Sequence, residues 1–290
     1  FHSLRFDAGS CTGCLACMRA CPTQAVRVRQ GVARLVPDRC IDCGECLKVC
    51  AEGAVHPLTS SLADLTRFDY TIAVPSPALY TQFDSEVTPG IIHEALRRCG
   101  FDDVAGLSWA CGAVTRAIEF VLGDHRGPQP WISGFCPTVV RLVQENYPGL
   151  VRHLLPVLSP REVAAREAKQ RVAAATQLPP DRIGTVYITP CPAKMASIVD
   201  HPGLDRSHID AVLSIRDLFQ LLVPAVREVR QEAVARTEPE TAAAMSWAFS
   251  IGGPSSLPAE DTMAVAGLPN VVRVLDDIEK GRLGHYALIE

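Results

Sequence analysis

The sequence predicts a small α+β module organised by cysteines, followed by a larger α/β domain. Two observations carry this expectation. Eight of the twelve cysteines in the 290-residue chain lie within its first fifty residues. From residue 68 onward, short apolar strands alternate with helical patterns, which is typical of α/β proteins. We therefore expect a first domain over residues 1–60 and a second over residues 66–290.

The eight N-terminal cysteines form two runs with the same spacing, C-x2-C-x2-C-x3-C. In ferredoxin-like modules such a run places three thiolates on one iron–sulfur cube and sends the fourth to the neighbouring cube. The spacing thus predicts two [4Fe–4S] clusters and a protein that moves electrons. The expected ligands are Cys11, Cys14, Cys17 and Cys50 for one cluster, and Cys40, Cys43, Cys46 and Cys21 for the other.

Structural zinc and a disulfide framework are the alternative uses of these cysteines. Zinc sites usually pair two short C-x2-C units, without a third cysteine at the same interval. Disulfides need an oxidising compartment, and no secretory signal follows the N-terminus. The doubled run, an internal repeat with one half for each run, favours the iron–sulfur interpretation.

Composition narrows the classes of partner. A formal charge of −4 and a pI near 6.1 argue against nucleic acid, whose partners normally carry a basic patch. No apolar stretch approaches the roughly 20 residues that span a bilayer, so we expect no membrane insertion and a cytoplasmic protein. The chain lacks an initiator methionine and stops in an apolar run at residues 286–290. We expect it to be cut from something longer, with a redox partner protein or fused domains beyond its ends; a homodimer stays open.

Local patterns predict the elements in order. Residues 25–28 and 33–36 flank Gln30-Gly31 as a hairpin, residues 53–57 begin a further strand, and residues 60–64 form a linker. In the larger domain, strands are expected at 70–74, 131–135, 184–189, 209–213 and 271–275. Helices are expected at 91–99, 109–122 and 139–145, after a capping box at Ser159–Glu162, and after a cap formed by Ser214 and Asp217. Residues 230–244 suggest an exposed loop or short helix, and Gly252-Gly253-Pro254 a turn.

Cys136 and Cys191 share one local context. Each follows an apolar strand and precedes a proline at the first position of a predicted helix. A sulfur at a helix N-cap is favoured as a thiolate, and open α/β sheets bind ligands at the carboxyl ends of their strands. As ligands, the two cysteines would face one cavity and share one metal centre. Two buried core thiols are the alternative, because free cysteine is often buried, and the residues alone leave both interpretations open.

In combination, these motifs resemble the catalytic subunit of the [FeFe] hydrogenases. Ser133-Gly134-Phe135-Cys136-Pro137 resembles that family's first signature, T-S-C-C-P. Thr189-Pro190-Cys191-Pro192-Ala193-Lys194 is similar to its second, M-P-C-x-x-K-x-x-E. Residues 248–253 look like its F-x-x-x-G-G segment. The match ends at residue 290, just before the third signature, M-A-C-x-x-G-C, so we expect a divergent member that is truncated there.

The resemblance implies an α+β ferredoxin-like dicluster module followed by a two-lobed α/β hydrogenase-like domain. In the family, the lobes enclose a [4Fe–4S] cube bridged to a di-iron centre with CO and cyanide ligands. Carried over, Cys136 and Cys191 are two ligands of a third cluster, with or without a di-iron centre, and Lys194 is a catalytic residue that hydrogen-bonds a cyanide. Cys111 is a candidate substitute ligand, with core packing as its alternative, and Cys99 is expected to pack.

Departures from the family pattern shape the expected function. Phe135 stands where the family has its proton-delivering cysteine, Ser197 replaces the glutamate of the second signature, and the third signature is missing. We expect electrons to pass through two [4Fe–4S] clusters to a cluster held by Cys136 and Cys191, with slow or sensory dihydrogen chemistry. Whether the chain is an active oxidoreductase stays open. The alternatives are an electron-transfer subunit with a third [4Fe–4S] or modified cluster acting on another substrate, and an Fe–S assembly or scaffold protein.

Overall fold

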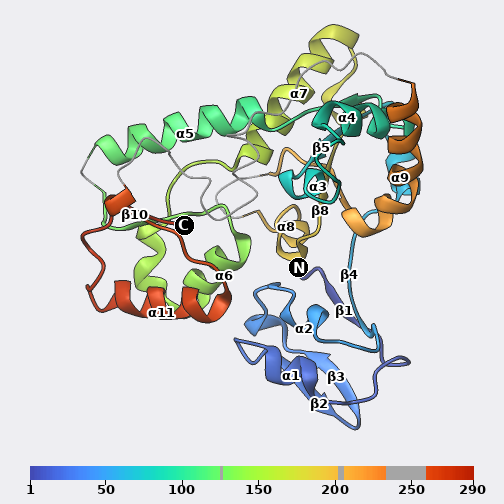
Figure 1. The fold of residues 1–290 in the computed structure, drawn as a ribbon. Helices are drawn as coiled ribbons and strands as arrows, with labels where there is room; N and C mark the ends of the chain where they lie inside the picture. The colour runs from blue at the N-terminus through green and yellow to red at the C-terminus, as the bar shows by residue number, and fades with distance from the viewer. Residues whose placement is uncertain (125–126, 202–205, 233–258) are drawn as a thin grey trace.

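The structure, a computed structural model, describes residues 1–124, 127–201, 206–232 and 259–290. A small N-terminal module lies beside two α/β lobes (Figure 1), which agrees with the expected fold class. Among the described helices, none is long and apolar enough to cross a membrane. The predicted features at residues 233–244, 248–253 and 252–254 lie outside the described residues.

The N-terminal module consists of two antiparallel strand pairs and two short helices. Its first and last strands pair with each other, and the predicted hairpin forms around Gln30 and Gly31, which both have positive φ as a tight hairpin turn requires. Leu4 and Val26 form the centre of a small core that the cysteines complete. The elements are β1 (Leu4–Phe6), α1 (Ala16–Ala20), β2 (Val26–Arg29), β3 (Val32–Leu35), η1 (Pro37–Arg39), α2 (Glu45–Lys48) and β4 (Val55–Pro57).

The first lobe is built on a four-stranded parallel sheet with the order β6-β5-β8-β9. Its two central strands are buried along almost their whole length, because helices cover both faces. Helices α3, α4 and α9 pack on one face and α7 on the other. The strands are β5 (Tyr70–Pro75), β6 (Asp103–Val104), β8 (Ile183–Thr189) and β9 (Ala211–Ser214); the helices are α3 (Pro77–Tyr80), α4 (Pro89–Arg98), α7 (Pro160–Thr176) and α9 (Ile215–Gln231).

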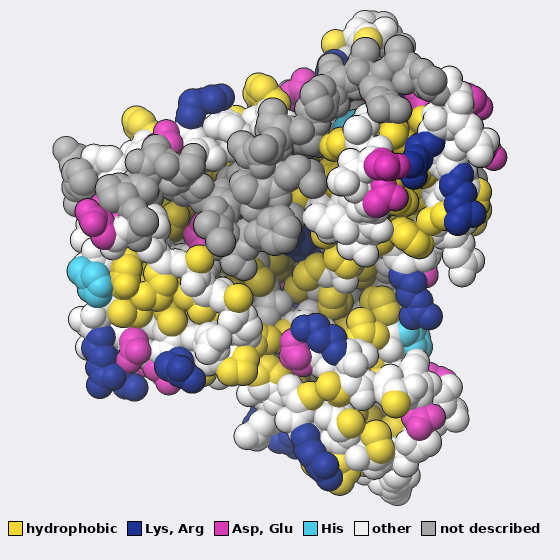
Figure 2. Space-filling model, viewed as in Figure 1, with side chains coloured by type: hydrophobic (Ala, Val, Ile, Leu, Met, Phe, Trp, Pro, Cys, Tyr) yellow, Lys and Arg dark blue, Asp and Glu magenta, His cyan; other side chains and the backbone are white. Residues whose placement is uncertain are grey.

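The second lobe is built on a three-stranded parallel sheet with the order β10-β11-β7. Helices α6 and α11 pack together with η3 on one face of this sheet. Hydrophobic side chains gather over this lobe in the space-filling view (Figure 2). Its elements are β7 (Trp131–Ile132), α6 (Pro137–Asn146), η3 (Pro148–His153), η5 (Ala259–Asp261), β10 (Thr262–Met263), α11 (Leu268–Glu279) and β11 (Leu288–Ile289).

Helix α5 (Ser108–Gly123) joins the two lobes (Figure 1). Near its N-terminus, Ala110 and Cys111 pack into a cluster with residues of the first lobe. Farther along, Val114 and Ile118 pack against Leu288 of the second lobe. One helix therefore contributes to both cores and fixes the lobes relative to each other.

The segment between the module and the first lobe is hydrogen-bonded rather than free. Ser61 and Asp64 form a capping box at the start of η2 (Leu62–Arg67). The backbone N–H of Ser60 donates to the carbonyl of Val212 in β9 at 2.8 Å, and Ser60 Oγ accepts from Val212 N at 3.2 Å. The expected linker is thus held along the edge of the four-stranded sheet.

Two local predictions are wrong, each for an identifiable reason. Residues 271–275 form part of α11 instead of a strand, because apolar residues at 268, 271, 275 and 278 have the spacing of a helix face, and that period prevails over the β-propensity of the valines. Helix α7 begins where expected, but Ser159 makes no capping hydrogen bond. Glu162 instead accepts from Ser207 Oγ at 2.8 Å and from His208 N at 2.7 Å.

The role of α5 can be tested with two substitutions on that helix. Ile118 is fully buried and Phe120 is 82% exposed. Ile118→Ala should lower the free energy of unfolding by about 2–5 kcal/mol, because the cavity it leaves lies in a packed core. Phe120→Ala should change it by less than about 0.5 kcal/mol. Anaerobic denaturant unfolding of the cluster-loaded protein measures both, and equal effects would contradict the placement of α5.

Candidate metal centres

Four cysteines from the two runs surround one small cavity in the N-terminal module. Apart from them, apolar side chains such as Val28 and Val55 make up much of its wall. The backbone N–H of Ala33 donates to Cys11 Sγ at 3.4 Å. The cavity therefore brings the last cysteine of the second run to the first three of the first run: Cys11, Cys14, Cys17 and Cys50.

The other four cysteines also converge. Burial raises the pKa of Cys40 to about 12, that of Cys43 to about 11 and that of Cys46 to about 12. The charge on Cys21 adds to the rise at all three sulfurs, so this cysteine of the first run lies among the second. Backbone N–H groups donate to two of the sulfurs, from Ala25 to Cys21 at 3.1 Å and from Asp42 to Cys40 at 3.4 Å.

The chemistry of these donor sets fits iron–sulfur cubes. Desolvated thiolates that repel one another are unstable without a compensating cation, and iron supplies that charge. Backbone N–H groups directed at the sulfurs are a typical means of tuning cluster potential. The crossed grouping is also the one expected from the spacing, with each run sending its fourth cysteine to the other.

The two runs follow the same backbone path. Gly13 and Asp42 occupy matching places between the first two cysteines of each run, and both have positive φ. Leu15 and Gly44, one residue after the second cysteine, match in the same way. Aspartate is among the few non-glycine residues that adopt this conformation readily. The predicted internal repeat is thus visible in the backbone as well as in the cysteines.

Cys136 and Cys191 line one cavity of about 450 Å³ between α6, α8 (Pro192–Ala196) and the second lobe. Each cysteine is the N-cap residue of its helix, and the proline that follows it is the first helical residue, as the sequence predicts. Lys194 and Phe135 line the same cavity, whose far wall is the apolar face of α11. The described residues provide two thiols here, half of the set that holds a [4Fe–4S] cube.

The expectation that the N-cap position favours a thiolate at Cys136 is wrong for the metal-free protein. Burial raises the pKa of Cys136, and the nearby charge of Cys191 raises it further. The N–H groups of Val139 and Thr138 and the charge of Lys194 oppose that rise without cancelling it, and Sγ forms no capping hydrogen bond. A solvent-sized probe reaches the residue from the cavity, but the surrounding protein desolvates the sulfur.

Ser197, which replaces the family's glutamate, is buried and tied into α8. Its hydroxyl donates to the carbonyl of Lys194 at 2.9 Å and accepts from Arg161 Nη2 at 2.7 Å. Arg161 also lies over the ring of Tyr187, with 5.6 Å between its guanidinium carbon and the ring centroid. A buried cation therefore stands next to the position where the family carries an acid.

The other two cysteines lie away from this cavity. Cys111 is 2% exposed and packs in a hydrophobic cluster with Val74 and Tyr187. It does not line the cavity of Cys136 and Cys191. Cys99, at the end of α4, packs against the core of the first lobe, as expected. The structure brings together Cys136, Cys191 and Lys194 but not Cys111.

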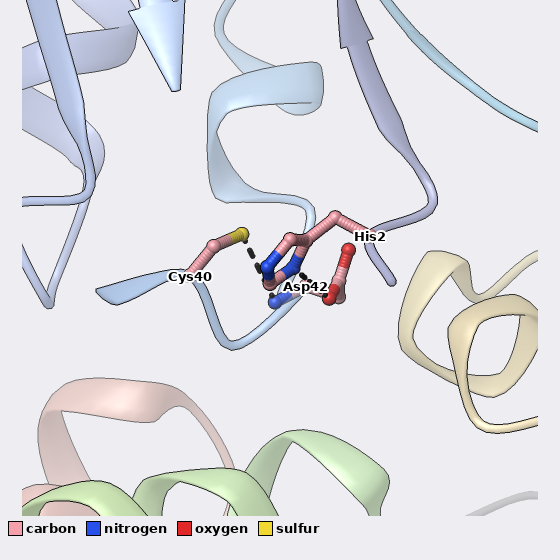
Figure 3. A group of neighbouring side chains, drawn as sticks. All are labelled: His2, Cys40 and Asp42. Atoms are coloured by element: carbon pink, nitrogen blue, oxygen red, sulfur yellow. Dashed lines mark hydrogen bonds and ion pairs between the residues drawn. The ribbon is translucent and has the colours of Figure 1, made fainter. Parts of the chain in front are cut away.

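The second cysteine run lies directly against the helices that follow Cys136 and Cys191. Asp42 is 1% exposed and accepts hydrogen bonds from His2 Nδ1 at 2.8 Å and from Ser3 N at 2.9 Å. Figure 3 shows His2, Cys40 and Asp42 close together, with α8 and α6 nearby. Arg141 of α6 also donates to Asp42, so the module and the larger domain share a buried ion pair.

Sequence reasoning missed Asp42, Arg141 and Arg161. An acid between two cluster cysteines is an unusual choice for a site that gathers negative charge, and that signal alone could have identified Asp42. Arg141 and Arg161 are two of twenty-four arginines and lie in no motif. Only the folded structure distinguishes them from surface residues.

The raised pKa of Cys136 predicts a specific pH dependence of its alkylation. In chelated, iron-free protein the reactive thiolate should be scarce at neutral pH, and the rate should still be rising at pH 9, the ordinary thiol pKa. Lys194→Met should slow the reaction at a given pH, because the positive charge opposes the rise. Peptide-resolved mass spectrometry after iodoacetamide pulses measures both effects. A rate that levels off below pH 9 would show that burial does not control this thiol.

Comparison with protein families gives two matches. Residues 69–256 match the iron only hydrogenase large subunit, C-terminal domain, and residues 3–51 match a 4Fe–4S dicluster domain.

Comparison with characterised proteins gives partial relatives. The chain is 30% identical over 149 residues to iron hydrogenase 1 of Clostridium pasteurianum, covering 49% of this chain and 26% of that protein. It is 24% identical over 252 residues to the NADP-reducing hydrogenase subunit HndD of Solidesulfovibrio fructosivorans, covering 74% and 43%. Over 46 residues it is 36% identical to one subunit of an ion-translocating oxidoreductase complex of Methanosarcina acetivorans, covering 16% and 17%. The chain thus spans less than half the length of each relative.

Solved structures share the fold at low identity. A variant of the [FeFe]-hydrogenase HydA1 from Chlamydomonas reinhardtii has a TM-score of 0.55 at 17% identity, covering 80% of this chain and 79% of that one. An [FeFe]-hydrogenase studied for oxygen inactivation of its H cluster has a TM-score of 0.54 at 16% identity, covering 79% and 80%. The expected fold class is confirmed. Because the catalytic-domain match covers more than half of the sequence, the chain is a divergent member of the [FeFe] hydrogenase family, with an N-terminal dicluster domain for [4Fe–4S] clusters.

Proposed function

We propose that this chain passes electrons through two [4Fe–4S] clusters to a metal centre held by Cys136 and Cys191, and that its dihydrogen chemistry is slow or sensory. The observation that carries the proposal is the position of Cys136, Cys191 and Lys194 on one cavity, next to the second cysteine run. The two domains of the proposal are residues 1–60, which carry the cluster pair, and residues 66–290, which carry the third centre.

The order of electron transfer follows from the packing. Ile41 and Cys43 of the second run pack in the hydrophobic cluster of the second lobe, together with Leu142 of α6. The cavity lined by the first run opens among residues of the module alone. The proposed cluster of Cys40, Cys43, Cys46 and Cys21 is therefore the one adjacent to the cavity, and the other accepts electrons from outside.

The donor set of the cavity supports an anionic metal centre. When bound, such a centre would supply the redox chemistry. Cys136 and Cys191 would hold it, and Lys194 would provide a positive charge and hydrogen-bond donors to its anionic ligands. The apolar face of α11 would exclude water from the opposite side. Two of the four ligands of a cube are accounted for in this way.

Proton delivery is where the chain departs from its family. Phe135 lines the cavity at the position of the expected proton donor and also packs against the core shared with α5. A phenyl ring has no exchangeable proton, and Ser197 is a poor acid that is already hydrogen-bonded. These two replacements support the slow or sensory role.

The same replacements favour a second candidate, an electron-transfer subunit whose third cluster is an ordinary or modified [4Fe–4S] cluster acting on another substrate. An Fe–S assembly or scaffold role is the remaining alternative. Two of the relatives are named as subunits, so in each case we propose a redox partner subunit; a homodimer is a further proposal. Infrared bands of CO and cyanide would support the di-iron centre, and their absence from fully iron-loaded protein would favour the second candidate.

Iron content tests the ligand assignment. The anaerobically purified wild type should hold about twelve iron atoms per chain, whereas the N-terminal pair alone accounts for about eight. Cys11→Ala, Cys43→Ala and Cys191→Ala should each lower iron by about four atoms. Cys99→Ala, at a packing cysteine, is the matched control and should keep the full content. Unchanged iron in the three ligand variants would refute the assignment.

Restoring a thiol at the cavity tests the missing proton donor. In a complete protein with its metal centre installed, Phe135→Cys should raise hydrogen turnover, because a positioned acid–base group contributes about 10²–10⁴-fold. Phe135→Ser gives a similarly small polar side chain that is a much weaker acid, and it should raise turnover less. Brisk turnover in the wild type, or no gain with cysteine, would show that protons take another route.

A further inference from the structure

The contact between the module and the larger domain is concentrated on a few polar atoms. Asp42 accepts from Ser3 N, from Ser3 Oγ at 3.2 Å, from His2 Nδ1 and from Arg141 Nη1. Ser3 Oγ also approaches the carbonyl oxygen of Pro192, to which it donates at 2.7 Å. Asp42 and Ser3 are almost completely buried. The backbone of the second cysteine run is therefore joined to α6 through Arg141 and to α8 through Pro192.

Arg141 connects three parts of the chain. Besides Asp42, it donates through Nη2 to Asp200 at 2.6 Å and to the carbonyl oxygen of Phe1 at 3.1 Å. Its side chain is 15% exposed, whereas that of Asp200 is 60% exposed. Arginine presents its donors in a fixed planar fork, so it holds the N-terminal strand, the second cysteine run and the segment after α8 in one arrangement.

Close packing reinforces this joint. A Cβ atom added at Gly44 would lie 2.9 Å from Cγ of Pro192, so the loop between Cys43 and Cys46 lies directly against the first residue of α8. Pro137, the first residue of α6, lines a small cavity together with Asp42 and Arg141. Pro137 and Pro192 directly follow Cys136 and Cys191. The joint therefore acts on the same two helix starts that position the cavity thiols.

We propose that Arg141, through Asp42, is the positioning residue that sets the separation between the second cysteine run and the cavity of Cys136 and Cys191, and so controls electron passage between them. The electron-passage part rests on the proposed function. The positioning part rests on the contacts alone. Neither Arg141 nor Asp42 holds a metal in this proposal.

The group of His2, Cys40 and Asp42 does not call for a metal ion of its own. Their ligand atoms lie within 4.8 Å of one another. However, hydrogen-bond donors of His2, Ser3 and Arg141 already satisfy the carboxylate of Asp42, and Cys40 belongs to the proposed cluster. The geometry favours a hydrogen-bonded joint over a fourth metal site.

Hydrogen exchange of the complete, cluster-loaded chain tests the positioning. Arg141→Ala should raise the exchange rates of residues 40–46 and 192–200 about tenfold or more, because it leaves the carboxylate of Asp42 buried without its charged partner. Arg141→Lys keeps the charge but not the fork, and should restore part of the protection. Asp200→Ala removes only the exposed anchor, leaves no buried charge unpaired and should have a smaller effect in the same direction.

Arg182→Ala is the matched control. Arg182 also pairs with an aspartate through two nitrogens, with Nε 2.8 Å from Asp69 Oδ2 and Nη2 2.5 Å from Oδ1, but both residues belong to the first lobe. Its loss should leave exchange at residues 40–46 and 192–200 unchanged. If Arg141→Ala and Asp200→Ala leave exchange unchanged as well, the positioning role is overturned.

Freeze-quench spectroscopy after mixing with dithionite tests electron passage. In Arg141→Ala with a full complement of iron, the N-terminal clusters should be reduced at the wild-type rate, and the cavity centre about 10–10²-fold more slowly, as expected for a small misplacement. Partial recovery in Arg141→Lys supports the proposal. Wild-type rates in Arg141→Ala overturn the control of electron passage. About eight iron atoms in the wild type would refute the proposed function instead, and with it electron passage, while hydrogen exchange would still decide the positioning.

Discussion

The structure depends on one constraint, the convergence of mutually repelling thiol sulfurs from distant parts of the chain. Within the N-terminal module, cysteines make up much of the core, and their burial raises the pKa of several of them. Such an arrangement is costly without a cation, because burial penalises charge and like charges repel. The short strands and one-turn helices of the module are arranged around this requirement rather than around a large apolar core.

The same constraint links the module to the rest of the molecule. The second cysteine run has its neighbouring residues Ile41 and Asp42 packed against the larger domain, one in a hydrophobic cluster and the other in a buried ion pair. The helices on the other side of this contact are those that start after Cys136 and Cys191. The contact therefore lies between the proposed cluster pair and the cavity, where an electron has to cross from one domain to the other.

Much of this organisation follows from local sequence. The cysteine spacing predicts the crossed grouping, and strand–Cys–Pro–helix patterns place Cys136 and Cys191 at equivalent ends of two different sheets. Where local signals compete, they mislead. The valines of α11 favour a strand until the helical period is counted, and the N-cap position of Cys136 favours a thiolate until desolvation is included. Asp42 with Arg141 and Ser197 with Arg161 arise from residues far apart in the chain, and no local pattern encodes which of many arginines meets which acceptor.

The most direct test of the account is an anomalous iron map from an anaerobically grown crystal of the iron-loaded chain. The account predicts three separate groups of iron peaks: one among Cys11, Cys14, Cys17 and Cys50, one among Cys40, Cys43, Cys46 and Cys21, and one in the cavity between Cys136 and Cys191. The second group should lie between the first and the third. An iron-free cavity in a crystal with both N-terminal groups occupied, or iron held by His2 and Asp42, would contradict it.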